Sequence, residues 1–69
     1  MKESIRTALG KKIKHYRTKC GYTQEKLSEL ADIDYKYLQR IEGKNPPAVK
    51  IDTIGKLAKA LNISPAELL

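Results

Sequence analysis

The sequence predicts an all-α protein, a single domain over residues 1–69 that contains five short helices. Apolar residues recur three and four positions apart along most of the chain, which is the spacing of a helix that buries one face. Gly, Pro, Asn and Asp residues fall between these segments, where they can end helices and form turns. A chain of 69 residues has room for one small core, because it buries only about 60% of the surface that it exposes when unfolded.

The first helix is predicted from an apolar stripe that runs toward Gly21, which serves as a C-terminal stop. Cys20 is the only cysteine, so it cannot form an internal disulfide. Its place on the stripe favours a small core residue in a reducing compartment, and a reactive or intermolecular thiol is the alternative. The stripe consists of Ile5, Leu9, Ile13, Tyr16 and Cys20.

Two further helical patterns lie between residues 23 and 43, on either side of a break too short to be a loop. Thr23 can cap the first of them and Asp34 the second, each by accepting a hydrogen bond from an otherwise unpaired backbone N–H. The break needs a positive φ, which Asp32 tolerates better than most residues, and Gly43 can adopt the left-handed conformation just past the second helix. The inward-facing residues are Leu27, Leu30 and Ala31 in the first helix and Leu38 and Ile41 in the second. This arrangement is a helix-turn-helix.

The outer face of the second of these helices, over about residues 34–42, is rich in hydrogen-bond donors. Lys36, Gln39 and Arg40 share one face at i, i+3 and i+4, and Tyr35 lies beside them. A helix with an apolar back and such a front suits the base edges in the major groove of DNA.

The segment after Gly43 is predicted to be a short stiff loop, because Pro46 and Pro47 restrict their predecessors and lack backbone donors. A fourth helix follows. Gly55 inside it costs about 1 kcal/mol relative to Ala, which either close packing or simple tolerance explains. Its apolar stripe consists of Ile51, Ile54, Leu57, Ala58 and Leu61.

The last predicted helix begins after Asn62, which can end the fourth helix in a left-handed conformation. Ser64 and Glu67 have the spacing of a capping box, and Pro65 stands at the first helical position between them. This fifth helix is expected to carry Leu68 and Leu69.

The net charge of +6 points toward a polyanion such as nucleic acid. The charge is concentrated in the first twenty residues, where Glu3 is the only acid among seven basic residues. Two interpretations remain open: the first helix attracts DNA over a distance, or it simply presents a solvated face. The basic residues are Lys2, Arg6, Lys11, Lys12, Lys14, Arg17 and Lys19.

No catalytic, metal or cofactor site is expected. The sequence contains no metal-ligand cluster, no nucleophile with a neighbouring base, no catalytic carboxylate pair and no Gly-rich phosphate loop. We therefore expect neither an enzyme nor a cofactor. No apolar run approaches the roughly 20 residues that span a bilayer, and the N-terminus lacks a signal-peptide centre, so we expect a cytoplasmic protein.

The region 23–43 resembles the Cro/repressor-type (XRE family) helix-turn-helix proteins, and the match extends over nearly the whole chain. Asp32 occupies a turn position where the family usually has Gly. The residues that carry the resemblance are Gln24 at the start of the first helix, Ser28, Asp32, Leu38, and the ending Ile41-Glu42-Gly43. The resemblance implies a compact five-helix, lambda-repressor-like DNA-binding domain.

The resemblance also implies roles for individual residues. Arg17 and Glu42 occupy the positions of a structural ion pair that ties the first helix to the end of the recognition helix. Tyr35 and Lys36 stand where relatives read bases, and packing is an equally good explanation for Tyr37, as a solvated turn is for Lys44 and Asn45. The residues implied to contact DNA are Thr23, Gln24, Tyr35, Lys36, Tyr37, Gln39, Arg40, Lys44 and Asn45.

The same resemblance implies a function. The leading hypothesis is a sequence-specific regulator of transcription that binds double-stranded DNA, most simply a repressor, and that acts as a homodimer on an inverted repeat. The dimer contact is expected around Leu68 and Leu69 or on the fourth helix. The alternative is an antitoxin-like or controller protein whose main role is to bind a protein partner, with DNA binding second.

Overall fold

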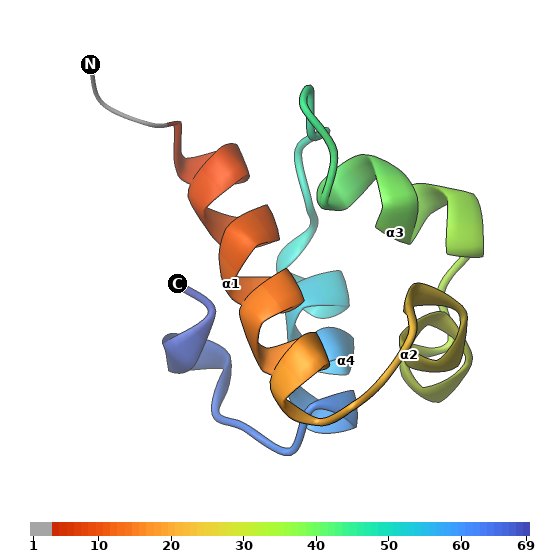
Figure 1. Ribbon diagram of the computed structural model, residues 1–69. Coiled ribbons are helices and arrows are strands. Elements are labelled where there is room, and N and C mark those ends of the chain that lie inside the picture. The colour runs from red at the N-terminus through yellow and green to blue at the C-terminus, as the bar shows by residue number, and fades with distance from the viewer. Residues whose placement is uncertain (1–3) are drawn as a thin grey trace.

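The computed structural model describes residues 4–69 and contains four α-helices and one turn of 3-10 helix (Figure 1). The predicted all-α class is confirmed, but the prediction of five α-helices is wrong. The last segment closes with i to i+3 bonds alone, from the N–H of Leu68 to Pro65 O and from that of Leu69 to Ala66 O, which form the tighter 3-10 turn used in short pieces. The elements are α1 (Ile5–Lys19), α2 (Gln24–Ala31), α3 (Tyr35–Ile41), α4 (Ile51–Ala60) and η1 (Pro65–Glu67).

Side chains cap the starts of most helices. Thr23 Oγ1 accepts from Lys26 N at 3.0 Å at the start of α2, and Asp34 Oδ2 accepts from Tyr37 N at 3.3 Å at the start of α3, as predicted. The predicted capping box is also present, because Ser64 N donates to a Glu67 carboxylate oxygen at 3.0 Å and the Ser64 side chain accepts from a backbone N–H. These caps satisfy donors that the first helical turn leaves unpaired.

The turns need left-handed backbone at three of the described residues. Asp32 has φ of 56°, Asn62 of 59° and Gly21 of 76°, each at a position predicted for a turn or a helix end. The prediction that Gly43 adopts the left-handed conformation is wrong, because its φ is not positive. The Gly43 N–H instead donates to Arg40 O at 3.1 Å. A Cβ at position 43 would lie 3.2 Å from Gln39 O, so the tight end of α3 is what favours a residue without a side chain there.

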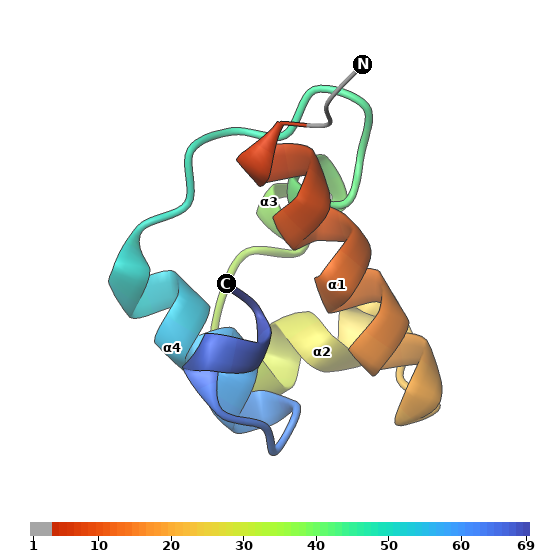
Figure 2. The ribbon, with the colours of Figure 1, turned by 90° about the vertical axis from the view of Figure 1, so that its left-hand side faces the viewer.

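The core lies where the four helices meet. Helix α2 contacts both α3 and α4, α1 contacts α3, and η1 packs on α4 and lies beside α1 (Figure 2). Lys12 Nζ donates to Leu69 O at 3.1 Å and holds the end of the chain against α1. The buried apolar residues are Leu9, Ile13, Leu27, Ala31, Leu38, Ile41, Ile54, Leu57, Ala58, Leu61 and Leu68.

Four residues predicted to lie in the core are exposed. Ile5 and Ile51 open α1 and α4 and are 80% and 72% exposed, because the packed part of each helix begins at a later turn. Leu30 is 46% exposed, since Leu27 and Ala31 fill the inner face of the short helix α2. Cys20 follows the last residue of α1 and is exposed, so its predicted core position is wrong.

Two glycines lie inside helices, and they differ in their surroundings. A Cβ at Gly10 of α1 would overlap the carbonyl oxygen of Ile41, so the backbones of α1 and the end of α3 touch at this point. A Cβ at Gly55 of α4 would meet no heavy atom within 4 Å, which excludes the close-packing explanation for that residue. Gly10 therefore fixes the distance between α1 and α3.

Over the described part of the chain, no helix has the length and apolar character that crossing a membrane requires.

Candidate nucleic-acid interface

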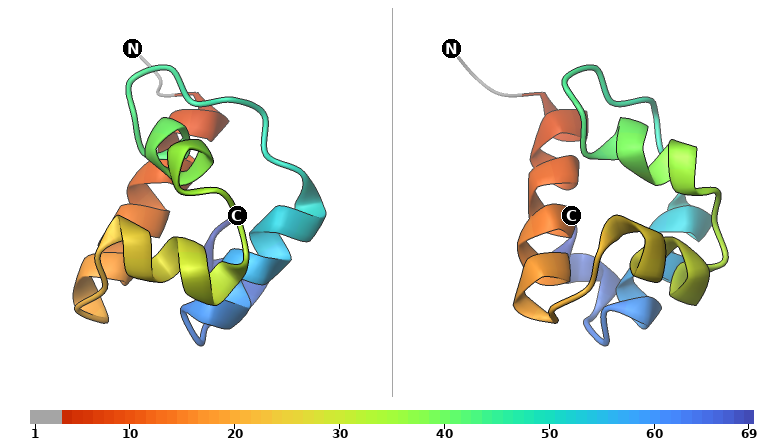
Figure 3. Two further views of the ribbon diagram at one scale, coloured as in Figure 1. Left: turned by 90° about the vertical axis from the view of Figure 1, so that its right-hand side faces the viewer. Right: turned by 45° about the vertical axis from the view of Figure 1, so that its right-hand side comes forward.

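The segment α2–turn–α3 forms a helix-turn-helix (Figure 3). The end of α2 is closed by hydrogen bonds from Asp32 N to Glu29 O at 3.2 Å and from Ile33 N to Ser28 O at 3.0 Å. Ser28 is only 5% exposed, and its hydroxyl donates to Glu25 O at 2.7 Å. A small residue that satisfies its own polar group fits the buried side of α2, where a larger polar one would not.

Helix α3 has an apolar back and a polar front. Leu38 and Ile41 are 0% and 1% exposed and fix α3 onto the core. The front comprises residues that are all exposed and that all carry hydrogen-bond donors: Tyr35, Lys36, Gln39 and Arg40. The structure thus brings together the four side chains that the sequence placed on one face.

Tyr37 lies at the edge of this face and is half-buried. Its ring packs against the core, and its hydroxyl donates to Ala48 O at 3.4 Å, in the loop that leads to α4. Tyr37 therefore packs on the core, as one of the two explanations from the sequence expected, and its hydroxyl also bonds to the loop before α4.

Glu42 joins three helices through its carboxylate. Arg17 of α1 donates to it twice, from Nε to Oε2 and from Nη2 to Oε1, both at 2.9 Å. The same guanidinium donates to Tyr22 O at 2.9 Å, and Gln24 Nε2 adds a bond to Glu42 Oε1 at 3.2 Å. The two charged side chains are 11% and 3% exposed, so the bidentate pair is largely removed from water.

Gln24 was expected only near the DNA backbone, and its bond to Glu42 is a finding that the sequence did not indicate. Eighteen positions separate the two residues, and no local pattern connects them. Gln24 therefore ties the start of α2 to the end of α3, next to the exposed N-cap residue Thr23. This bond helps to set the position of α2 relative to α3.

Exposed basic residues lie on α1 and on the loop after α3, which flank the helix-turn-helix. Lys44 and Asn45 are exposed on the loop after α3. The exposed basic residues on α1 are Arg6, Lys11, Lys12, Lys14 and Lys19, whereas Lys2 lies outside the described residues. The sequence did not indicate that Lys11 and Thr7 of α1 line one groove with Gly43 and Lys44.

Among residues 4–69 no group of three His, Cys, Asp or Glu side chains is placed to hold a metal ion.

Comparison with known proteins places the chain in a family. A helix-turn-helix family model matches residues 13–68. The control protein C.BamHI of Bacillus amyloliquefaciens is 36% identical over 70 aligned residues, which cover 100% of this chain and 85% of that protein.

Solved structures agree with this placement. The restriction-modification controller protein C.AhdI of Aeromonas hydrophila superposes with a TM-score of 0.87 at 34% identity, covering 93% of this chain and 96% of that one. C.Esp1396I bound to a 19 base pair DNA duplex superposes with a TM-score of 0.86 at 26% identity, covering 96% and 87%. The chain therefore belongs to the Cro/repressor-type (XRE) helix-turn-helix family.

Proposed function

We propose that this protein is a sequence-specific regulator of transcription that binds double-stranded DNA and reads the major groove with α3. The observation that carries the proposal is the exposed donor face of α3 on a helix whose back is fixed in the core by Leu38 and Ile41. Donors on a rigid helix can be aimed at base edges without the cost of ordering a flexible loop. Similarity to C.Esp1396I, a relative solved on a DNA duplex, supports the same reading.

Individual roles follow from position on the helix-turn-helix. Tyr35 and Lys36 in the first turn of α3 contact bases, because a recognition helix presents its N-terminal residues to base edges. Gln39 and Arg40, one turn later, reach bases or phosphates. The residues proposed to contact the DNA backbone are Thr23, Gln24, Tyr37, Lys44 and Asn45.

The simplest mechanism is that the bound protein occupies a promoter and blocks transcription, so that the protein is a repressor. Its proposed location is the cytoplasm. Similarity to the control protein C.BamHI and the controller C.AhdI favours a second possibility, in which the regulated genes are those of a restriction-modification system. Neighbouring genes for an endonuclease and a methyltransferase would support this possibility. A neighbouring toxin gene would instead support the antitoxin-like role.

The binding unit is proposed to be a homodimer on an inverted repeat. One recognition helix reads only a few base pairs, so two copies are needed for specific affinity, with half-site centres about 34 Å or one DNA turn apart. Leu68 is 1% exposed and belongs to the monomer core, which corrects its expected place in the dimer contact. Among residues 4–69, the large apolar side chains that are exposed outside the helix-turn-helix are Leu69, 60% exposed, and Ile5 and Ile51 at the starts of α1 and α4.

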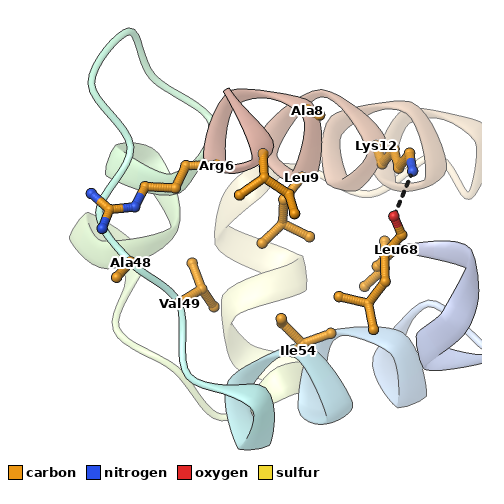
Figure 4. Close-up of a pocket in the computed structure, with 10 residues that line it drawn as sticks. Arg6, Ala8, Leu9, Lys12, Ala48, Val49, Ile54 and Leu68 are labelled. Atoms are coloured by element: carbon orange, nitrogen blue, oxygen red, sulfur yellow. Dashed lines mark hydrogen bonds between the residues drawn. The ribbon is translucent and has the colours of Figure 1, made fainter. Parts of the chain in front are cut away.

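An apolar pocket of about 220 Å³ opens between α1, α4 and the C-terminal residues Leu68 and Leu69 (Figure 4). Leu9 of α1, Ile54 of α4 and Leu68 converge on it, and Ile5 and Leu69 are also among its lining residues. A second copy that covered the pocket would bury further apolar area, so we place the dimer contact on this side of the molecule.

Selection of bound duplexes from a random DNA pool tests the proposal. We expect enrichment of an inverted repeat by the wild-type chain at moderate salt, and no enrichment with a variant that carries Lys36→Ala and Arg40→Ala together. Failure of the wild-type protein to enrich any sequence would contradict the function.

A further inference from the structure

The apolar pocket between α1, α4 and the C-terminal residues has the size and the lining of a small-molecule site. Its volume is about 220 Å³, and its apolar walls are aliphatic: Leu9 of α1, Ile54 of α4 and Leu68 converge on it, and Val49 in the loop before α4 also lines it (Figure 4). A cavity of about 150 Å³ with an aliphatic and aromatic lining already holds a molecule of the size of benzene. The pocket is therefore large enough for a short aliphatic chain.

Two cations and no acid are found among the described residues that line this pocket. Figure 4 shows Arg6 reaching from α1 toward Ala48 on one side and Lys12 on the opposite side. Lys12 Nζ donates to Leu69 O at 3.1 Å, which uses one of its three N–H donors. Both charged groups that a ligand meets at the pocket are thus positive.

An aliphatic wall beside a cation selects a ligand with an apolar tail and an anionic head. The tail gains about 25 cal/mol for each Å² of apolar surface that it removes from water. A guanidinium matches a carboxylate in charge and accepts it in a bidentate pair, which is among the stronger hydrogen-bonded arrangements. Arg6 is exposed and its guanidinium is planar and always charged, so it is the better of the two cations for such a pair.

We propose that this pocket binds a small aliphatic carboxylate, whose head pairs with Arg6 and whose chain lies between Leu9, Ile54 and Leu68. The protein would then carry an effector site on the side of the molecule opposite in role to the DNA-reading face of α3.

The site bears on assembly, because Ile5 and Leu69 line the pocket and also belong to the surface where we place the dimer contact. A bound chain occupies space that apolar side chains of a second copy would fill, so the ligand and the second copy compete. The carboxylate should therefore weaken the dimer and, through it, DNA binding. This regulatory step rests on the function proposed above, whereas binding of the carboxylate does not.

The first test uses sodium octanoate as the probe and follows the methyl NMR signals of the wild-type protein during a titration. Octylammonium has the same chain with the opposite charge, and acetate has the same head without the chain. We expect octanoate to shift the methyl signals of Leu9, Val49 and Ile54 and to bind at least about tenfold more tightly than either control.

The second test removes the cation or fills the pocket. Arg6→Gln should weaken octanoate binding about tenfold. Lys14→Gln is the matched control, because Lys14 is an exposed cation on α1 that does not line the pocket, and its effect should stay below about twofold. Val49→Phe should also weaken binding by placing a ring in the space of the chain. Thermal melts show whether the variants are folded, and the comparison of the three probes needs no variant at all.

The third test measures the dimer by sedimentation with and without saturating octanoate. The dissociation constant of the dimer should rise at least about tenfold for the wild-type protein, in keeping with the reciprocity of linked binding. An unchanged dimer would overturn the competition between ligand and second copy.

Failure of octanoate to bind at millimolar concentration, or equal binding of octanoate and octylammonium, would overturn this inference and leave the proposed function intact. A stable dimer that excludes octanoate would show that a second copy is the occupant of the pocket. Absence of DNA binding without any octanoate would instead contradict the proposed function.

Discussion

At the scale of single residues, Glu42 is the point on which α1, α2 and α3 converge. Its carboxylate accepts three N–H bonds, two from Arg17 and one from Gln24. A largely buried charge is tolerated only while its partners remain, and the loss of one partner leaves the other charge uncompensated. The pair therefore holds the helix-turn-helix in its orientation against α1.

Arg17→Ala is expected to lower the free energy of unfolding by roughly 3–5 kcal/mol, a large part of the stability of a small domain. Glu42→Ala should cost a similar amount, and the two losses should not add in the double variant, because the variants remove the same interaction. Denaturant melts measure all three, with Glu29→Ala as an exposed control that should change stability by less than about 0.5 kcal/mol. A loss below about 1 kcal/mol for Arg17→Ala would mean that the pair does not support the fold.

The same substitution at two glycines should have opposite effects. Gly10→Ala removes the helix penalty of glycine but forces a methyl group against the carbonyl of Ile41, so we expect a net destabilisation of about 1–3 kcal/mol. Gly55→Ala meets open space inside α4 and should stabilise the protein by about 1 kcal/mol. Thermal melts of the two variants decide the matter, and equal shifts of the same sign would contradict the backbone contact between α1 and α3.

At the scale of elements, the sequence predicts best what local chemistry determines. Thr23 and Asp34 cap their helices, and Asp32 takes the left-handed conformation, because each depends on bonds within a few positions. The ends of the apolar stripes were predicted less well. Ile5 and Ile51 continue the helical period, but burial requires a neighbouring element, and the packed turns begin after them.

The family resemblance implied one contact between distant segments, the Arg17–Glu42 pair, but two others had no local signal. The spacing of Gly10 within α1 does not reveal that Ile41 lies against it, and the sequence of α2 does not show that Gln24 bonds to Glu42. The candidate DNA-reading face was predictable because its members share one short helix. The groove that joins Lys11 to Lys44 was not, because it forms only when α1 packs on the end of α3.

At the scale of the whole molecule, the proposed function requires two copies on one DNA site. Sedimentation should show a dimer at micromolar concentration, and Ile51→Glu should weaken it at least about tenfold by placing a charge in an apolar contact. Leu30→Glu is the matched control, because Leu30 is an exposed apolar residue on α2 and does not line the apolar pocket. A strict monomer at high concentration, together with one protein per selected DNA site, would rule out the dimer.

The central claim is that α3 reads the sequence while the loop after it holds the backbone. Selection from a random DNA pool with Tyr35→Ala, Lys36→Ala and Lys44→Ala tests this claim most directly. Loss of a base contact should cost about 1–3 kcal/mol on the preferred site and flatten the preference at one position of the half-site. Loss of Lys44 should weaken all sequences alike and lower the salt slope by about 1.

We therefore expect that Tyr35→Ala and Lys36→Ala change the selected half-site and that Lys44→Ala leaves it unchanged. An unchanged half-site for both α3 variants, with a changed one for Lys44→Ala, would show that α3 does not occupy the major groove.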